Sequence, residues 1–146
     1  MMKDVKELFI DTNILVYATS QKSPLYDQAN KKLALASDTG IALIISPQII
    51  REYLSATTRN LHNSQAYDDI IYNIQMFQND FHIVDDNKTV VSALEKLVQA
   101  YSVSGKQVHD ANIVATMQVY GIKYLLTHNI CDFDRYSNII SIISLV

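Results

Sequence analysis

The sequence predicts an α/β fold in which a mostly parallel β-sheet of about five strands is flanked by helices on both faces. Short apolar, β-branched runs alternate along the chain with longer amphipathic stretches, an order typical of parallel sheets covered by helices. No internal repeat or Pro- and Gly-rich linker interrupts this alternation, since the 146 residues include only three glycines and two prolines. We therefore expect residues 1–146 to form one domain.

The predicted strands are five short apolar runs. Each is rich in isoleucine, leucine, phenylalanine or valine and is bounded by polar or turn-forming residues. In chain order they are ELFI at 7–10, IALIIS at 41–46, FHIV at 81–84, YLLT at 124–127 and the segment 140–144.

The segments between the strands have the periodicity of amphipathic helices. Ser46 and Pro47 stand where the N-cap and the first residue of one helix are expected. Tyr120-Gly121 provides a helix stop directly before a strand. The predicted helices are 25–38, 47–60, 64–79, 88–101 and 108–120.

Composition excludes several classes of protein. Apolar runs are far shorter than the roughly 18 residues of a membrane span, and the first residues, MMKDVKELFID, carry acids where a signal peptide needs apolar residues. The single cysteine, Cys131, cannot form an internal disulfide or a cysteine metal cluster. We expect a cytoplasmic protein. Because its net charge is −3, any nucleic-acid binding must be local or assisted by metal ions.

Two acidic residues follow predicted strands, where open α/β sheets bind ligands. Asp11 comes directly after the first strand, and its alternative role is to cap a helix, as Thr12 or Asn13 also could. Glu52 lies at the edge of the apolar arc of the helix after the second strand. The alternative for Glu52 is a solvated side chain at a boundary.

Asp110 is a third candidate because of its position on a helix. At about 100° per residue it shares a face with Ile113, Val114 and Met117, which is the face expected to be buried. The helix dipole favours a first-turn carboxylate by about 0.3–1 kcal/mol on any face, whereas burying an unpaired carboxylate costs several kcal/mol. Either a cation meets Asp110 or the residue lines a cleft.

The segment YLLTHNICDFDRY holds further polar candidates beyond the strand that ends at Thr127. Turn formation is the alternative role for such residues. The apolar Phe133 between Asp132 and Asp134 suggests that one aspartate points inward and the other is solvated. We expect Asp132 to be the inward one, with Asn129 as another polar residue of this segment.

Four carboxylates converging at the strand ends would repel one another unless their pKa values rise or cations bind. A site with oxygen ligands and no cysteine or paired histidines favours Mg²⁺ or Mn²⁺ over Zn²⁺. Such ions activate water and stabilise the charge that develops in phosphodiester hydrolysis. The predicted metal and catalytic residues are Asp11, Glu52, Asp110 and Asp132.

Three basic residues near these acidic segments are candidates for phosphate contacts, namely Arg59, Lys106 and Arg135. The alternative for each is an ordinary solvated side chain. His109 adjoins Asp110, but neighbours on a helix point about 100° apart. We therefore expect His109 to have a structural or substrate-contacting role and not a catalytic one.

Together, the stretches FIDTNILVYA, SPQIIREYL, HDANIVATM and LLTHNICDF resemble the PIN-domain family, and specifically its VapC-type ribonuclease toxins, over nearly the whole chain. The resemblance implies a PIN-like fold and a metal-dependent endoribonuclease that leaves a 5′-phosphate. It makes Asp11, Glu52 and Asp110 metal ligands. It also implies a homodimer and a cognate antitoxin protein as partner.

In the same resemblance, Asn13 and Thr127 are supporting residues that orient the ligands or the water. Many relatives read Thr-Asn-Asp after this strand, whereas this chain has Thr127-His128-Asn129 and then Asp132. Asp132 is therefore the expected fourth acid, with Asn129 as the alternative.

Two rival functions remain open at this stage. A phosphatase or phosphotransferase could also place an aspartate after its first strand, although the haloacid-dehalogenase-like pattern needs a second aspartate where this chain has Asn13. An inactive PIN-like module that only binds a partner is the other alternative, and the presence of all four acids argues against it.

Overall fold

A parallel five-stranded sheet forms the centre of the protein in a computed structural model that describes residues 2–146. The strand order is β3-β2-β1-β4-β5, and all four pairings are parallel. This confirms the predicted sheet. The strands are β1 (Glu7–Ile10), β2 (Ala42–Ile45), β3 (His82–Ile83), β4 (Tyr124–Thr127) and β5 (Ser141–Ser144).

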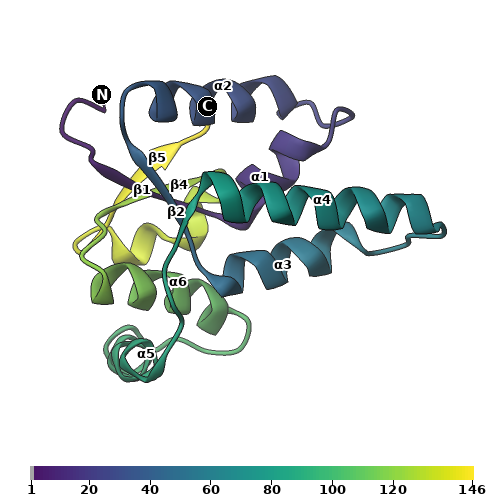
Figure 1. The fold of residues 1–146 in the computed structure, drawn as a ribbon. Helices are drawn as coiled ribbons and strands as arrows, with labels where there is room; N and C mark the ends of the chain where they lie inside the picture. The colour runs from purple at the N-terminus through teal and green to yellow at the C-terminus, as the bar shows by residue number, and fades with distance from the viewer. Residues whose placement is uncertain (1) are drawn as a thin grey trace.

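Helices cover both faces of this sheet. Figure 1 shows α2 along the upper face and α6 below the sheet, with α5 outside α6, while α3 and α4 run side by side and project to the right. None of the helices within residues 2–146 is long and apolar enough to cross a membrane. The helices are α1 (Thr12–Thr19), α2 (Tyr26–Asp38), α3 (Pro47–Thr57), α4 (Ser64–Asp80), α5 (Lys88–Tyr101) and α6 (Gln107–Val119).

The predicted helices are present, and α1 is an additional one. Two helix ends differ from expectation. Ser46 occupies the N-cap of α3, but its hydroxyl makes no capping bond and has no partner within residues 2–146. α3 ends at Thr57 instead of residue 60, where the hydroxyls of Thr57 and Thr58 bond to carbonyls four residues earlier and Asn60 adopts a φ of 60°.

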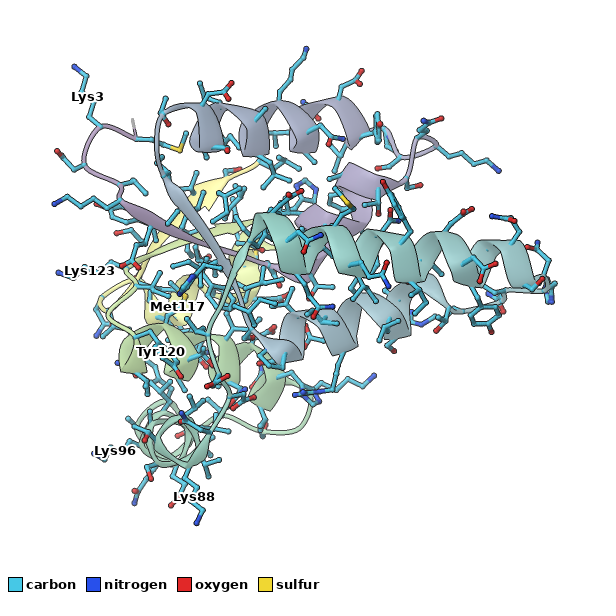
Figure 2. All side chains as sticks on the ribbon, viewed as in Figure 1. Lys3, Lys88, Lys96, Met117, Tyr120 and Lys123 are labelled. Carbon is cyan, nitrogen blue, oxygen red and sulfur yellow. The ribbon has the colours of Figure 1, made fainter. Side chains whose placement is uncertain are left out.

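The core lies between the sheet and its helices. Central strand residues such as Phe9 and Leu126 are fully buried, as are the apolar residues of α6 between Ala111 and Met117. Met117 lies on the inner side of α6, whereas Lys96 extends into solvent from α5 (Figure 2). Each fully buried apolar side chain contributes about 1.5–3 kcal/mol, so this core fixes how α6 sits against the sheet.

The strand order places a topological switch point between β1 and β4. From β1 the chain moves outward to β2 and β3, and then returns across the sheet to β4 and β5. The backbone N–H of Asp11, just beyond β1, donates to the carbonyl of Leu126 in β4 at 3.0 Å. The carboxyl end of such a switch point is where open α/β sheets bind ligands.

Candidate active site

Asp11 lies at the switch point with its carboxylate buried and fully engaged. Oδ1 accepts a hydrogen bond from the Thr12 N–H at 2.8 Å. Oδ2 accepts from the Thr127 hydroxyl at 2.7 Å and from Asn13 Nδ2 at 3.2 Å. Asp11 therefore caps α1, as the alternative interpretation proposed, and is also held in one orientation at the strand ends.

Asn13 and Thr127 join the start of α1 to the end of β4. The Thr127 hydroxyl accepts from Asn13 Nδ2 at 3.4 Å and from the Asn129 N–H at 3.1 Å. The Asn13 side-chain oxygen accepts from the His128 N–H at 3.3 Å. These bonds place both residues where an orienting role requires them, directly beside Asp11.

Glu52 is half-buried, unlike the solvated side chain of the alternative interpretation. Its Oε1 accepts a hydrogen bond from the Thr12 hydroxyl at 2.9 Å, and its Oε2 accepts from Gln48 Nε2 at 2.9 Å. Because hydrogen bonds to a charged group are stronger than neutral ones, these two donors hold the carboxylate firmly.

Gln48 links the helix of Glu52 to the helix of Asp110. It is buried, and its Nε2 also donates to the carbonyl of His109 at 2.8 Å while its Oε1 accepts from Asn112 Nδ2 at 2.7 Å. Both side-chain hydrogen bonds between α3 and α6 in the described residues therefore involve Gln48. Asn112 Nδ2 continues the network to Asp86 Oδ2 at 3.1 Å.

Asp110 faces a cavity and not the apolar core. It is half-buried in the first turn of α6, and within residues 2–146 its carboxylate makes no side-chain hydrogen bond and no ion pair. Asp110 lines a cleft, which is one of the two explanations expected for its inward phase.

The acidic cavity is a hollow of about 350 Å³ at the carboxyl end of the sheet. It brings together side chains from the β1–α1 turn, α3, α6 and the segment after β4. Its walls include Asp11, Asn13, Tyr17, Glu52, Asp110 and Asn129.

Burial and like charges raise the pKa of two of these carboxyl groups. Burial raises the pKa of Asp11 to about 6, with the charges of Glu52 and Asp132 adding to it, although the Thr127 and Thr12 hydrogen bonds act in the opposite direction. Burial raises the pKa of Asp110 to about 7, followed by repulsion from Asp11, Asp132 and Glu52. A bound cation would lower both values.

The prediction that Asp132 points inward is wrong. Asp132 ends a short 3₁₀ turn at Ile130–Asp132 and is exposed, because Phe133 takes the buried position in this segment. The negative charge of Asp132 nevertheless contributes to raising the pKa values of Asp11 and Asp110. Asn129, not Asp132, lines the acidic cavity, and Asp134 is exposed as predicted.

The acidic cavity offers oxygen donors but no preformed cage. Among residues 2–146, no three His, Cys, Asp or Glu side chains are arranged to hold a metal ion by themselves. This fits Mg²⁺ better than a fully enclosed ion, because Mg²⁺ keeps several waters and uses one or two carboxylates together with substrate phosphates. Asp11 and Asp110, which both line the cavity and both have a raised pKa, are the residues that fit this description.

Basic side chains gather in a second hollow beside the acidic cavity. This hollow of about 550 Å³, called the basic groove below, is lined by Arg51, Arg59, Lys106 and His109 and shares Glu52 with the acidic cavity. Two of the three predicted phosphate contacts, Arg59 and Lys106, therefore meet there. Arg135 lines neither hollow, and its guanidinium donates to the carbonyl of Tyr101 at 3.5 Å.

Several residues of the site were not predicted. Gln48 stands four residues before Glu52 on α3, a spacing that places the two side chains together and was available from the sequence. Thr12 was considered only as a possible cap. The contacts of Asn112 with Gln48 and Asp86 depend on how α6 packs beside α3, and no local pattern indicates that.

Comparison with known proteins identifies similar folds over almost the whole chain. The family profile described as PIN domain matches residues 8–138. No curated protein sequence matches the chain significantly.

Three solved structures illustrate the structural similarity. The VapBC2 complex of Rickettsia felis, bound to a promoter DNA fragment, aligns with a TM-score of 0.72 at 19% identity over 94% of this chain and 98% of that chain. The DNA-bound VapBC of Salmonella typhimurium gives 0.69 at 16% identity over 96% and 98%. Mycobacterium tuberculosis VapC20, described as a sarcin-ricin loop cleaving toxin, gives 0.62 at 14% identity over 81% and 86%.

Proposed function

Because the chain belongs to the PIN-domain family, we propose that it is an endoribonuclease that hydrolyses RNA phosphodiester bonds with the help of Mg²⁺ or Mn²⁺. One observation supports this most directly. Asp11, Glu52 and Asp110, which come from three separate elements, line one polar cavity at the switch point of the sheet. The sarcin-ricin loop cleaving activity in the description of VapC20 supports the choice of RNA.

In this proposal Asp11, Glu52 and Asp110 hold the ion together with waters and the substrate phosphate, since the acidic side chains of residues 2–146 form no cage by themselves, and Asp132 or Asn129 completes the site. A bound Mg²⁺ or Mn²⁺ supplies an activated water and offsets the charge that develops on the phosphate oxygens. The raised pKa values of Asp11 and Asp110 support this role, because burial and then repulsion disfavour the charged carboxylates, and a nearby positive charge would offset both.

The surrounding residues keep these carboxylates in place. Thr127 and Asn13 donate to Asp11, and Thr12 and Gln48 donate to Glu52. Hydrogen-bonded ligands of this kind are oriented before substrate arrives, which reduces the reorganisation needed during reaction. Asp110 has no such partner and remains free to meet a cation.

The biological role that we propose is that of the toxin in a VapBC-type toxin–antitoxin pair. The support is structural similarity to VapBC complexes along 94–96% of this chain. We further propose a homodimer acting in the cytoplasm, with residues 1–146 as one nuclease domain and an antitoxin protein as partner. Growth arrest on expression, relieved by the gene next to it, would support the toxin role, and light scattering tests the dimer.

The decisive experiment measures cleavage of structured and single-stranded RNA by the wild type and by the Asp11→Asn and Asp110→Asn variants, with Mg²⁺ and with EDTA. Asp134→Asn is the matched control, because it removes one carboxylate from an exposed position outside the acidic cavity. We expect cleavage by the wild type and the control only when Mg²⁺ or Mn²⁺ is present.

Other outcomes would point to the rival functions. Cleavage that is equal in all variants and in EDTA would exclude this mechanism. RNA binding without cleavage would indicate a PIN-like binding module. Hydrolysis of p-nitrophenyl phosphate without cleavage of RNA would indicate a phosphatase.

A further inference from the structure

We infer that the basic groove binds the sugar-phosphate backbone of single-stranded RNA on one side of the cleavage position only. This inference rests on the proposed function, since it assigns a substrate-binding role to a hollow next to the proposed active site. It goes further by stating that only one flank of the RNA is held and which side chains hold it.

The first observation behind this inference is the position of the basic groove beside the acidic cavity. Glu52 lines both the acidic cavity and the basic groove, so the two hollows adjoin at one side chain. Gln48, Glu52 and Ser55 are spaced four and three residues apart and form one stripe along α3. Arg59 lies two residues beyond the end of α3 and lines the basic groove but not the acidic cavity, which places it beyond the acidic cavity along the groove.

The second observation is the positive charge of the basic groove. Within residues 2–146 the one ion pair joins Arg51 to Asp86 at 3.8 Å, so Arg59 and Lys106 have no carboxylate partner. The Arg51 side chain is 65% exposed, and an exposed pair of this kind contributes little. Three cations in one hollow of a chain with a net charge of −3 make a local site for phosphate groups.

The rest of the wall of the acidic cavity differs in kind. Apart from Asp11, Glu52 and Asp110 it is formed by Thr12, Asn13, Val16, Tyr17, Ala56 and Asn129, and none of these side chains is cationic. Tyr17 stacks edge-to-face with His128, with ring centroids 5.6 Å apart. A phosphate at the acidic cavity therefore has basic side chains on the side of the basic groove, and none among the residues that line the acidic cavity itself.

Salt-dependent binding of a fluorescein-labelled oligouridine tests the inference. The protein carries Asp110→Asn throughout, so that the RNA is not cut during the measurement. Arg59→Ala and Lys106→Ala are each expected to weaken binding and to reduce the slope of log K against log salt by about 0.7, the value for one phosphate contact to a single strand. Lys96→Ala is the matched control, because Lys96 is an exposed base on α5 that does not line the basic groove (Figure 2).

A second readout tests the one-sided arrangement. Oligonucleotides that contain one cleavage site are shortened from the 5′ end or from the 3′ end, and binding is measured again. Shortening one end is expected to weaken binding of the otherwise intact protein but not of the Arg59→Ala, Lys106→Ala double variant, whereas shortening the other end has little effect in either.

The outcomes distinguish failure of the groove assignment from failure of the proposed nuclease activity. Unchanged salt slopes in Arg59→Ala and Lys106→Ala, or equal losses from both ends of the RNA, would overturn the inference even if the wild type cleaves RNA. Groove-dependent binding of RNA by a wild type that cannot cleave it would overturn the proposed nuclease and leave the groove assignment standing. Groove-dependent binding of a polyglutamate peptide, without groove-dependent RNA binding, would assign the groove to a protein partner and overturn the inference.

Discussion

Replacing Asp110 with asparagine is expected to make the metal-free protein more stable at neutral to basic pH, although it removes a proposed catalytic residue. The Asp110 carboxylate is half-buried near the charges of Asp11, Asp132 and Glu52, and within residues 2–146 it has no hydrogen-bonding side chain or cation as partner. Asparagine has nearly the same shape and no charge. The substitution therefore removes repulsion without leaving a void.

The pH dependence of this effect follows from the direction of the pKa change. In the folded protein the pKa of Asp110 is raised from 3.8 to about 7. Between these two values the unfolded chain releases a proton that the folded protein retains, so the free energy of unfolding falls as the pH rises. Above about pH 7 the carboxylate is ionised in both states and the full penalty remains. The stabilisation by asparagine should be largest there and should shrink as the pH falls toward 4.

The size of the stabilisation by Asp110→Asn follows from the rise in the pKa of Asp110. A rise of about three pH units corresponds to about 4 kcal/mol, but partial exposure of Asp110 allows solvent to screen much of this. Asparagine also gives up the roughly 0.3–1 kcal/mol that a first-turn carboxylate gains from the helix dipole. A net stabilisation of about 1–2 kcal/mol remains, or roughly 2–8 °C in the melting temperature of a chain of this length.

Scanning calorimetry in EDTA across this pH range measures the effect. Asp134→Asn is the control, because the same chemical change at an exposed side chain outside the acidic cavity should give no comparable gain. Adding Mn²⁺ should raise the melting temperature of the wild type more than that of Asp110→Asn. The reasoning is refuted if Asp110→Asn melts at or below the wild-type temperature at pH 8, or if its gain does not change with pH.

Two further predictions concern residues that support the site, and a third concerns the turn after α6. Gln48→Met removes the hydrogen bonds between α3 and α6 and should lower the free energy of unfolding by about 2 kcal/mol. Calorimetric titration should also show that this variant binds Mn²⁺ more weakly than the control Gln78→Met, which makes the same change at an exposed side chain. Thr127→Val removes the 2.7 Å hydrogen bond to Asp11 and should cost about 1–3 kcal/mol at pH 8, which urea unfolding measures; an unchanged midpoint would contradict the role of that bond. Gly121→Ala should cost about 1 kcal/mol, because Gly121 has a φ of 69° with open space around it, and should leave RNA cleavage unaffected.

Local patterns were sufficient to predict the fold and the three acids that line the cavity. Asp11 follows directly after an apolar strand, and the helical phase of Asp110 could be calculated from its neighbours alone. Parallel strands then bring their carboxyl ends to one edge, so residues far apart in sequence could be expected to meet. These predictions required only periodicity and topology.

The remaining features depend on packing that has no local signature. Asp132 was placed inward because Phe133 lies beside it, but a 3₁₀ turn, not a strand or helix, sets the direction of its side chain. The Gln48–Asn112 contact exists because α3 and α6 meet at a particular separation. The basic groove likewise combines Arg59 just after α3 with Lys106 just before α6, and each taken alone is an ordinary exposed base.

The hydrogen bonding of the acids divides the site into fixed and open parts. Asp11 accepts three hydrogen bonds and Glu52 accepts two, so their positions are set by the folded chain. Asp110 accepts none from side chains and has a pKa raised to about 7, so its charge is the one that the protein leaves uncompensated. A carboxylate with an uncompensated charge lowers the free energy of unfolding of the metal-free protein, and a bound cation stabilises the folded protein most through such a group. If the proposed function holds, the residue that weakens the empty protein is therefore also the one through which metal binding should stabilise it most.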